Sequence, residues 1–343
     1  MTVVVWGTGA IGGVVGAGMA AAGEDVTLVD IVPEHVAAMN RDGLLVRSAE
    51  GEQRVAVRAA LPDEIAGPIE IVVLAVKSQH TDAALEQIAP LLGPESVVVS
   101  LQNGLNEPQI AARVGSQRTI GAMVDFSADY HGPGLIMRGR TGALYVGELD
   151  GSMTRRLERV RQLLAHAMPA ASTGNIMGYV WSKLCKGSMD GTTALVDASI
   201  AEVRGNHKFQ PVLAAVIREG ALVGAAEGVR LEPYEQFRPD AFLDTGPNGM
   251  AAAARVLDEM AEEATHDLKV RTGYWRDIVV RKRRTEVHHI TGEIVERGRA
   301  HGIATPVNQR QLELFDEIED GRRAMGWQNL EELLGLTPWP PLE

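Results

Sequence analysis

Three glycines near the start of the sequence have the spacing G-x-G-x-x-G, a pattern that can bind a dinucleotide. Gly7 permits a tight turn, Gly9 leaves room for a pyrophosphate beside the backbone, and Gly12 lets the next helix pack close to its strand. The free amides and the dipole of that helix favour phosphate at its N-terminus. The predicted dinucleotide-binding loop is Gly7, Thr8, Gly9, Ala10, Ile11 and Gly12.

A carboxylate, Asp30, ends the second β-branched run, DVTLVD, where an acidic residue can bind the ribose of a dinucleotide. A carboxylate there accepts hydrogen bonds from the ribose hydroxyls and repels a 2′-phosphate, and its sequence neighbours are apolar. NAD(H) is therefore favoured, while NADP(H) stays open if the more distant Arg41 or Arg47 reaches the site. Asp30 could also cap the helix expected from about Pro33, which is compatible with either cofactor.

Lys183 lies in a mostly small and apolar stretch, WSKLCKGSMDGTTAL, at residues 181–195, which contains one other lysine, Lys186. In a helix Lys183 would share its face with Lys186, Gly187, Asp190 and Gly191. Each glycine inside a helix costs about 1 kcal/mol relative to alanine, so this bare face indicates that another group comes close. A cation beside a carbonyl that receives hydride would stabilise the alkoxide and supply its proton. A solvated surface lysine is the alternative interpretation.

The composition is that of a globular protein large enough for two domains, with 343 residues of which 45% are hydrophobic. The formal net charge of −12 argues against a nucleic acid or an anionic membrane as partner. The single cysteine, Cys185, permits no intramolecular disulfide and is consistent with a reducing, cytoplasmic location. Residues 3–23 carry no charge, but seven of them are glycine and no basic region precedes them. We therefore expect a soluble protein rather than one with a membrane span.

Strand-like and helical patterns alternate through the first part of the chain, which predicts a doubly wound α/β domain of the Rossmann type. Residues 69–76 form a run that is apolar except for Glu70 and is typical of a buried parallel strand, and residues 96–102 repeat the form. From about Thr119, short strands separated by turn residues are expected to form antiparallel hairpins that extend the same sheet. The pattern beyond a last strand near residues 169–174 is helical. The predicted domains are residues 1–174 and an all-helical domain, residues 175–343.

Four segments resemble the ketopantoate reductase (2-dehydropantoate 2-reductase) family: LAVKSQHTDAAL, SLQNGLNE, WSKL and RRTEVHHITGEIVERGRAHGIATPVN. The resemblance extends over nearly the whole chain. It implies an NAD(P)H-dependent oxidoreductase that interconverts a ketone and an alcohol, with a small-molecule 2-oxo acid as substrate in the cleft between a Rossmann domain and a helical domain. A homodimer is an expectation at the level of the family.

The resemblance also implies roles for four residues. Lys183 matches the catalytic lysine that protonates the carbonyl oxygen, and Glu286 matches a glutamate that holds the nicotinamide-side ribose and the network around it. Asn103 matches an asparagine beside the nicotinamide, and Lys77 matches a lysine that lines the cofactor cleft. We expect no metal at His288 and His289, because the resemblance already explains Glu286 beside them.

This sequence departs from the family where the substrate would bind. Asparagines one and two turns after the lysine are replaced by Gly187 and Gly191, and a serine of the family aligns with Gly273. The departures predict weak binding of ketopantoate and a pocket that the glycines enlarge or reshape. Asp190 is a candidate to orient Lys183 or to bind a hydroxyl or amine, and Lys186 a candidate carboxylate anchor. A dehydrogenase for another hydroxy acid, sugar acid or opine, and a non-catalytic dinucleotide sensor, are the alternatives.

Overall fold

The computed structural model describes residues 2–266 and 270–339 of the chain. The chain divides into two compact units, Met1–Ile176 and Met177–Glu343. This division falls two residues after the predicted boundary at residue 174. Residues 3–23, the uncharged stretch, form a strand, a glycine-rich loop and a helix in the first unit.

Eight strands form the main sheet of the first unit. Their spatial order is β12 (Ala170–Ser172), β11 (Ala143–Glu148), β8 (Thr119–Asp125), β7 (Leu92–Ser100), β6 (Ile69–Leu74), β1 (Val3–Trp6), β2 (Val26–Val29) and β5 (Arg58–Ala60). The strands from β8 to β5 in this order are parallel, and β11 is antiparallel to β8. The predicted doubly wound α/β class is confirmed.

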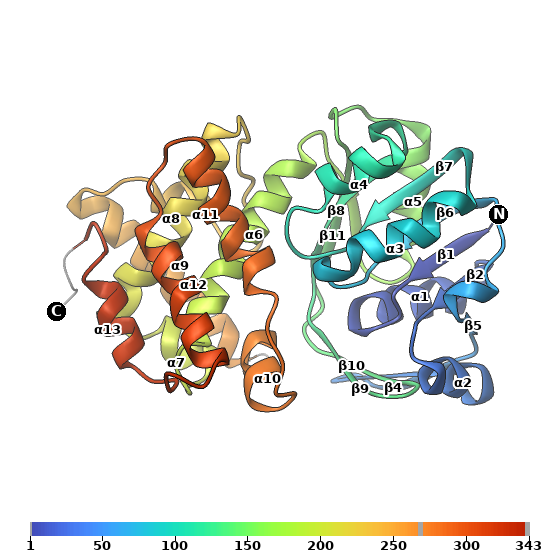
Figure 1. The fold of residues 1–343 in the computed structure, drawn as a ribbon, viewed down its shortest axis with the longest axis horizontal. Helices are drawn as coiled ribbons and strands as arrows, with labels where there is room; N and C mark the ends of the chain where they lie inside the picture. The colour runs from blue at the N-terminus through green and yellow to red at the C-terminus, as the bar shows by residue number, and fades with distance from the viewer. Residues whose placement is uncertain (1, 267–269, 340–343) are drawn as a thin grey trace. The chain divides into compact units, whose positions relative to one another are not determined.

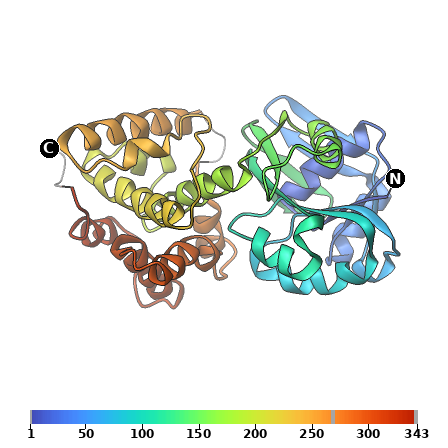
Figure 2. The same cartoon turned by 90° about the horizontal axis from the view of Figure 1, so that it is seen from above.

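Helices cover both faces of this sheet (Figures 1 and 2). One face carries α1 (Ala10–Ala21) and α5 (Arg155–Ala165), and the other carries α3 (Thr81–Ile88) and α4 (Glu107–Val114). A further helix, α2 (Pro33–Asp42), packs beside β5. Because both faces are covered, the central strands are apolar at nearly every position, as a parallel sheet requires.

A second sheet packs against α1, and its four strands are β4 (Gly51–Val55), β3 (Leu44–Ser48), β10 (Leu135–Arg138) and β9 (Ala128–Gly132). The prediction that the strands after Thr119 all extend the main sheet is right for β8 and β11 and wrong for β9 and β10. The reason is α1, which has no polar face and is therefore buried on two sides. The Ile136 side chain of β10 lies so close to Gly13 of α1 that a methyl group there would be 2.0 Å from it.

The regular elements in the described residues of the second unit are helices, as predicted, apart from one isolated bridge between Tyr234 and Phe237. Its helices are α6 (Ile176–Thr193), α7 (Ile200–Arg204), α8 (Gln210–Ala226), α9 (Pro247–Thr265), α10 (Gly273–Val279), α11 (Thr291–Ala300), α12 (Pro306–Glu319) and α13 (Gln328–Leu334). Residues 207–226, which include α8, have the length and composition of a membrane span, but most of this segment is buried inside the unit, as in a core helix.

Short 3-10 helices connect these elements. They are η1 (Pro62–Glu64), η2 (Ser78–His80), η3 (Ala89–Leu91) and η4 (Ser116–Arg118) in the first unit, and η5 (His207–Phe209), η6 (Pro239–Phe242) and η7 (Val287–His289) in the second. Two of them, η2 and η7, lie directly beside candidate site residues.

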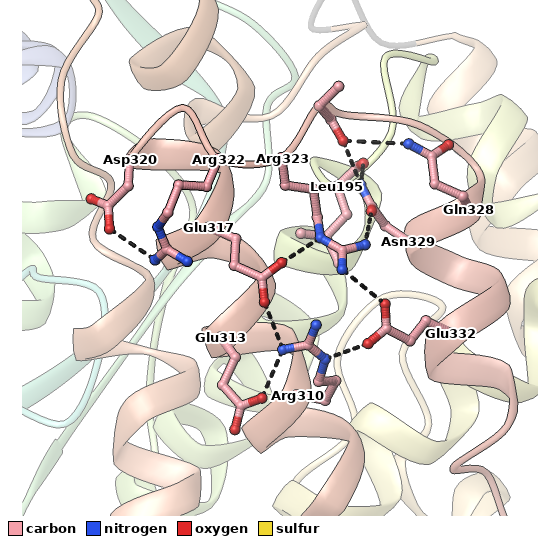
Figure 3. Close-up of polar contacts among 11 residues, drawn as sticks. Leu195, Arg310, Glu313, Glu317, Asp320, Arg322, Arg323, Gln328, Asn329 and Glu332 are labelled. Atoms are coloured by element: carbon pink, nitrogen blue, oxygen red, sulfur yellow. Dashed lines mark hydrogen bonds and ion pairs between the residues drawn. The ribbon is translucent and has the colours of Figure 1, made fainter.

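A cluster of charged side chains fixes α13 to α12 (Figure 3). Arg310 contacts Glu313 at 2.8 Å, Glu317 at 2.9 Å and Glu332 of α13 at 2.6 Å. Arg323 pairs with the same Glu317 and Glu332. The Arg310 side chain is only 20% exposed, so these contacts are partly shielded from solvent.

Replacing Arg310 with methionine should lower the free energy of unfolding by about 2 kcal/mol, because three carboxylates lose a shared cation. The matched control is Arg322→Met, which removes an exposed pair with Asp320 (Figure 3) and should change the free energy by less than about 0.5 kcal/mol. Urea denaturation of both variants measures the difference. Equal effects would contradict a stabilising role for the Arg310 cluster.

Candidate functional site

The glycine loop between β1 and α1 has the geometry that its sequence predicts. Gly7 has a φ of +96°, and a methyl group on it would lie 2.7 Å from the Val76 backbone nitrogen. A methyl group on Gly12 would lie 2.1 Å from the Gly7 carbonyl oxygen. At Gly9 a methyl group would meet nothing within 4 Å. The fold thus requires the first and third glycines, whereas the second borders open space at the N-terminus of α1.

This open space fits the phosphates of a dinucleotide. Gly9 is the N-cap residue of α1, and it offers no side chain to the first amides of the helix. The first turn of α1 contains no acidic residue that would compete for these amides. The backbone N–H groups and the helix dipole therefore present positive charge at a bare surface.

Asp30 holds the glycine loop directly. Its Oδ2 accepts a hydrogen bond from the Thr8 N–H at 3.0 Å, and its Oδ1 accepts one from the Val32 N–H at 3.0 Å. The N-cap residue of α2 is Val32, so the interpretation of Asp30 as the cap of this helix is wrong. Each carboxylate oxygen can accept a further hydrogen bond, which leaves Asp30 able to bind ribose hydroxyls.

Both arginines that could accept a 2′-phosphate have acidic partners, and a second carboxylate, Glu34, acts on the same tyrosine as Asp30. Arg41, one of the two candidates to accept a 2′-phosphate, pairs with Asp42 at 2.6 Å, and the other, Arg47, pairs with Glu52 on the neighbouring strand. Burial raises the pKa of Tyr130 above its usual value, and the charges of Asp30 and Glu34 raise it further. The negative charges of Asp30 and Glu34 therefore both act on Tyr130, close to the end of β2.

Lys77 and Asn103 follow β6 and β7. Strand β6 lies beside β1 and β7 lies beside β6, and all three strands are parallel. The positions of Lys77 and Asn103 place them at the same edge of the sheet as the glycine loop. A polar network joins their two loops: Ser78 Oγ donates to the Asn103 carbonyl at 2.5 Å, and Asn106 Nδ2 donates to the same oxygen at 2.6 Å.

The same network extends to two further buried side chains. Gln102 Nε2 donates to Thr81 Oγ1 at 2.8 Å and to the Val76 carbonyl at 2.9 Å. Sequence reasoning missed Ser78, Thr81, Gln102 and Asn106. Their polar types directly beside Lys77 and Asn103 were the available signal.

In the helical unit, α6 carries Lys183, Gly187, Asp190 and Gly191. Lys183 is partly exposed. A methyl group on Gly191 would lie 2.8 Å from Gln311 Nε2 of α12, and Gly191 is buried. The prediction that this glycine enlarges a substrate pocket is therefore wrong, because the space belongs to a helix contact. Gly187 is partly exposed, and a methyl group there would lie 3.3 Å from Ile290 Cγ2, so its role toward a substrate stays a prediction.

Two other charged residues of α6 have partners in the same unit. Asp190 Oδ1 accepts a hydrogen bond from Arg204 Nη2 at 2.6 Å, and the Arg204 side chain is almost fully buried. Lys186 Nζ lies 5.2 Å from the centre of the Tyr234 ring, a cation–π contact. Asp190 thus connects α6 to α7, and the substrate roles suggested for both residues stay predictions.

Glu286 directly precedes η7 and lies near a buried tyrosine that sequence reasoning missed. Burial raises the pKa of Tyr274 well above its usual value, and the negative charges of Glu286 and Asp190 add to the effect. These two candidate carboxylates therefore lie around one neutral phenol. Gly273, which aligns with the family's serine, comes directly before Tyr274 at the start of α10, and a methyl group on it would meet nothing within 4 Å.

Buried polar side chains lock α6 to α11 and α12. Ser188 Oγ donates to Asn308 Oδ1 at 2.7 Å, and Thr192 Oγ1 donates to Gln311 Oε1 at 2.7 Å. Gln311 Nε2 donates to the Ser188 carbonyl at 2.9 Å, and the Thr291 hydroxyl contacts Ser188 Oγ at 2.8 Å. This network fixes the helix that carries Lys183 relative to the segment that follows Glu286.

A buried carboxylate, Glu219 of α8, completes this network at the N-terminus of α12. It accepts hydrogen bonds from the Val307 N–H at 3.0 Å and from the Asn308 N–H at 2.9 Å, and also from Asn308 Nδ2. Burial raises the pKa of Glu219, and the three donated hydrogen bonds act in the opposite direction. Glu219 therefore caps α12 from a neighbouring helix.

The remaining reactive side chains have structural roles. Burial raises the pKa of the Cys185 thiol to about 12, as expected of an inert buried cysteine. His288 pairs with Asp316 at 2.9 Å, and Glu293 pairs with Arg297 at 3.0 Å. Within residues 2–266 and 270–339, no three His, Cys, Asp or Glu side chains are grouped so as to hold a metal ion.

Comparison with known proteins identifies relatives along nearly the whole chain. The family model Ketopantoate reductase PanE/ApbA matches residues 3–151, and the model of its C-terminal part matches residues 175–319. A 2-dehydropantoate 2-reductase from Streptococcus pyogenes serotype M3 is 27% identical over 322 residues, which cover 93% of this chain and 98% of the relative.

Solved structures show the same fold. A PanE/ApbA family ketopantoate reductase from Ralstonia eutropha JMP134 superposes with a TM-score of 0.77 at 27% identity, over 94% of this chain and 99% of that chain. D-mandelate dehydrogenase, solved with NADH and anilino(oxo)acetate, superposes with a TM-score of 0.80 at 22% identity, with the same coverage of both chains.

Two glycine substitutions should separate binding from folding. Gly9→Ala places a methyl group in open space, so it should weaken NADH binding about tenfold or more and lower the free energy of unfolding by about 1 kcal/mol or less. Gly12→Ala should lower that free energy by about 3 kcal/mol, because its methyl group collides with the Gly7 carbonyl. Fluorescence titration with NADH and urea denaturation measure the two effects. Unchanged NADH affinity in Gly9→Ala would contradict the assignment of this loop.

Proposed function

This chain belongs to the ketopantoate reductase family, and on that premise we propose that it is an NADH-dependent reductase of a 2-oxo acid with Lys183 as general acid. Membership makes it an NAD(P)-dependent oxidoreductase that acts on CH–OH donors. The observation that carries the proposal is the glycine loop, whose second glycine leaves bare, positively polarised amides at the N-terminus of α1.

The proposed mechanism assigns one step to each group. When bound, the dihydronicotinamide supplies a hydride to the carbonyl carbon of the substrate. The ammonium group of Lys183 stabilises the negative charge that develops on the carbonyl oxygen and donates the proton that completes the alcohol. Glu286 would hold the ribose next to the nicotinamide. Lys77 and Asn103, which follow β6 and β7, would border the cofactor.

The preference for NADH is supported by the surroundings of Asp30. The two amide hydrogen bonds fix its carboxylate at the end of β2, where a 2′-phosphate would meet its charge. The charge of Glu34 acts on the same region, and Arg41 and Arg47 are engaged with acidic partners. D-mandelate dehydrogenase, which shares this fold, was solved with NADH.

The favoured substrate class is a 2-oxo acid, and ketopantoate is one member of this class. Ketopantoate is the substrate of the family's named members, but Gly187 and Gly273 supply none of the polar side chains that the family uses. Product analysis across a panel of 2-oxo acids, sugar acids and opine precursors distinguishes these substrates.

Replacing Lys183 with methionine should lower kcat at least about a hundredfold, because the general acid is lost, while the affinity for NADH stays within about threefold. Lys208→Met, which removes an exposed lysine paired with Glu331 in the same unit, is the matched control and should leave kcat unchanged. Loss of nicotinamide absorbance with saturating 2-oxo acid measures kcat of both variants. Full activity of Lys183→Met would refute the mechanism, and a wild-type protein that binds NADH but never turns over would be a sensor.

The preference for NADH over NADPH should depend on the surface charge of Glu34. The wild-type protein should show a kcat/KM for NADH at least about tenfold above that for NADPH. Glu34→Lys replaces a negative charge near Asp30 with a positive one and should raise kcat/KM for NADPH about fivefold, an effect that falls with added salt. The NADH value should stay nearly constant. A wild-type preference for NADPH would show that the role of Asp30 is misassigned.

A further inference from the structure

A buried histidine, His35 of α2, connects the glycine loop to the second sheet. Its side chain is only 1% exposed. Its Nε2 lies 2.9 Å from the Thr8 carbonyl oxygen, and its Nδ1 lies 2.9 Å from the Gly134 backbone nitrogen. Gly134 belongs to the turn between β9 and β10, 99 residues further along the chain. The mechanism above gives this histidine no role.

The two contacts determine which ring nitrogen carries the hydrogen. The Gly134 N–H can only donate, so Nδ1 of His35 must accept and carries no hydrogen. The Thr8 carbonyl can only accept, so Nε2 must carry the hydrogen and donate it. The neutral Nε2–H tautomer alone satisfies both partners. The turn of the second sheet thus selects the form of His35 that binds the loop.

The hydrogen bond to Thr8 sets the direction of the next amide. The Thr8 carbonyl and the Gly9 N–H belong to one trans peptide unit, so they point in opposite directions. His35 holds the carbonyl on one side, and the Gly9 N–H is thereby directed to the other. Asp30 holds the preceding peptide through the Thr8 N–H, and the Thr8 hydroxyl donates to the Val29 carbonyl at 2.8 Å. Thr8 therefore has little freedom to rotate.

The position of His35 is itself fixed by packing. The Tyr130 ring of β9 meets the His35 ring edge-on, with centroids 5.1 Å apart and an interplanar angle of 88°. Gly134 has a φ of +71°, a conformation that favours glycine, and this turn directs its N–H at the imidazole. The second sheet therefore supports the loop through one side chain, in addition to packing on α1.

We propose that His35 is a positioning residue of the dinucleotide site. Its Nε2–H holds the Thr8 carbonyl so that the Gly9 amide is presented to the pyrophosphate, and Gly134 maintains the tautomer that this requires. The inference rests on the proposed function, because it assumes that the loop binds a dinucleotide. The second sheet thus contributes to the affinity for the cofactor and does not take part in the chemical step.

Two amide substitutions separate the contacts of the imidazole. His35→Gln places an N–H near the position of Nε2, so the contact with Thr8 is kept and that with Gly134 is lost. His35→Asn places its amide near Nδ1, so the contact with Gly134 is kept and that with Thr8 is lost. We expect the Kd for NADH to rise about tenfold in His35→Asn and to stay within about threefold of wild type in His35→Gln. At saturating NADH, kcat should be unchanged in both variants.

The matched controls are His207→Asn and His207→Gln, which alter an exposed histidine paired with Asp258 in the helical unit and should leave NADH binding unchanged. Equal weakening of NADH binding in both His35 variants, or a loss of kcat at saturating NADH, would overturn the positioning role. A wild-type protein that binds neither NADH nor NADPH would refute the proposed function itself. Binding by wild type and by His35→Asn with equal affinity would refute only the present inference.

A measurement on the unmodified protein tests the inference even if the variants fail to fold. Nitrogen-15 NMR of the imidazole of His35 should show a neutral ring with its hydrogen on Nε2. The Nε2–H resonance should shift when NADH is added, because the Thr8–Gly9 peptide then gains a phosphate partner. A hydrogen on Nδ1, or a resonance that does not respond to saturating NADH, would overturn the proposal.

Discussion

The packing of α1 between two sheets is the constraint on which the first unit depends. A methyl group on Gly12 would lie 2.1 Å from the Gly7 carbonyl oxygen, and one on Gly13 would lie 2.0 Å from Ile136 Cδ1. The backbone at Gly12 requires glycine, and the absence of a side chain at Gly13 leaves room for the end of the Ile136 side chain, although each interior glycine costs about 1 kcal/mol relative to alanine. The apolar surface that α1 buries on its two sides offsets this cost. The location of its N-terminus, and with it the proposed phosphate site, follows from this packing.

Close packing fixes the position of the backbone. Hydrogen bonds between buried groups then set the direction in which the functional groups point. In the first unit, Thr8 has its N–H, its carbonyl and its hydroxyl each bound to a different partner. In the second unit, Ser188 and Gln311 tie α6 to α11 and α12. Apolar contacts tolerate small rotations, whereas a buried donor must meet its acceptor at a defined angle. Each unit therefore orients its candidate residues through paired polar groups inside its core.

Local sequence patterns predicted the doubly wound sheet, the glycine loop and the helical second unit, because alternation and spacing are properties of neighbouring residues. They could not predict contacts between distant segments. The pairing of β10 with β3 and the hydrogen bond from Gly134 to His35 join residues that are far apart in the chain. For the same reason Gly191 was misread: the residue that fills its space, Gln311, lies on another helix. The apolar character of α1 on all sides was the one local signal of a second sheet.

Asp30 combines two roles that cannot be changed separately. Its carboxylate holds the Thr8 N–H, and the same charge carries the proposed preference for NADH. A substitution that admits a 2′-phosphate by removing this carboxylate would also release the peptide before Thr8. Glu34 is exposed on the first turn of α2 and holds no part of the loop in the described structure. A change of cofactor preference that preserves the loop must therefore act through neighbours such as Glu34, because the geometry of the phosphate site depends on Asp30 itself.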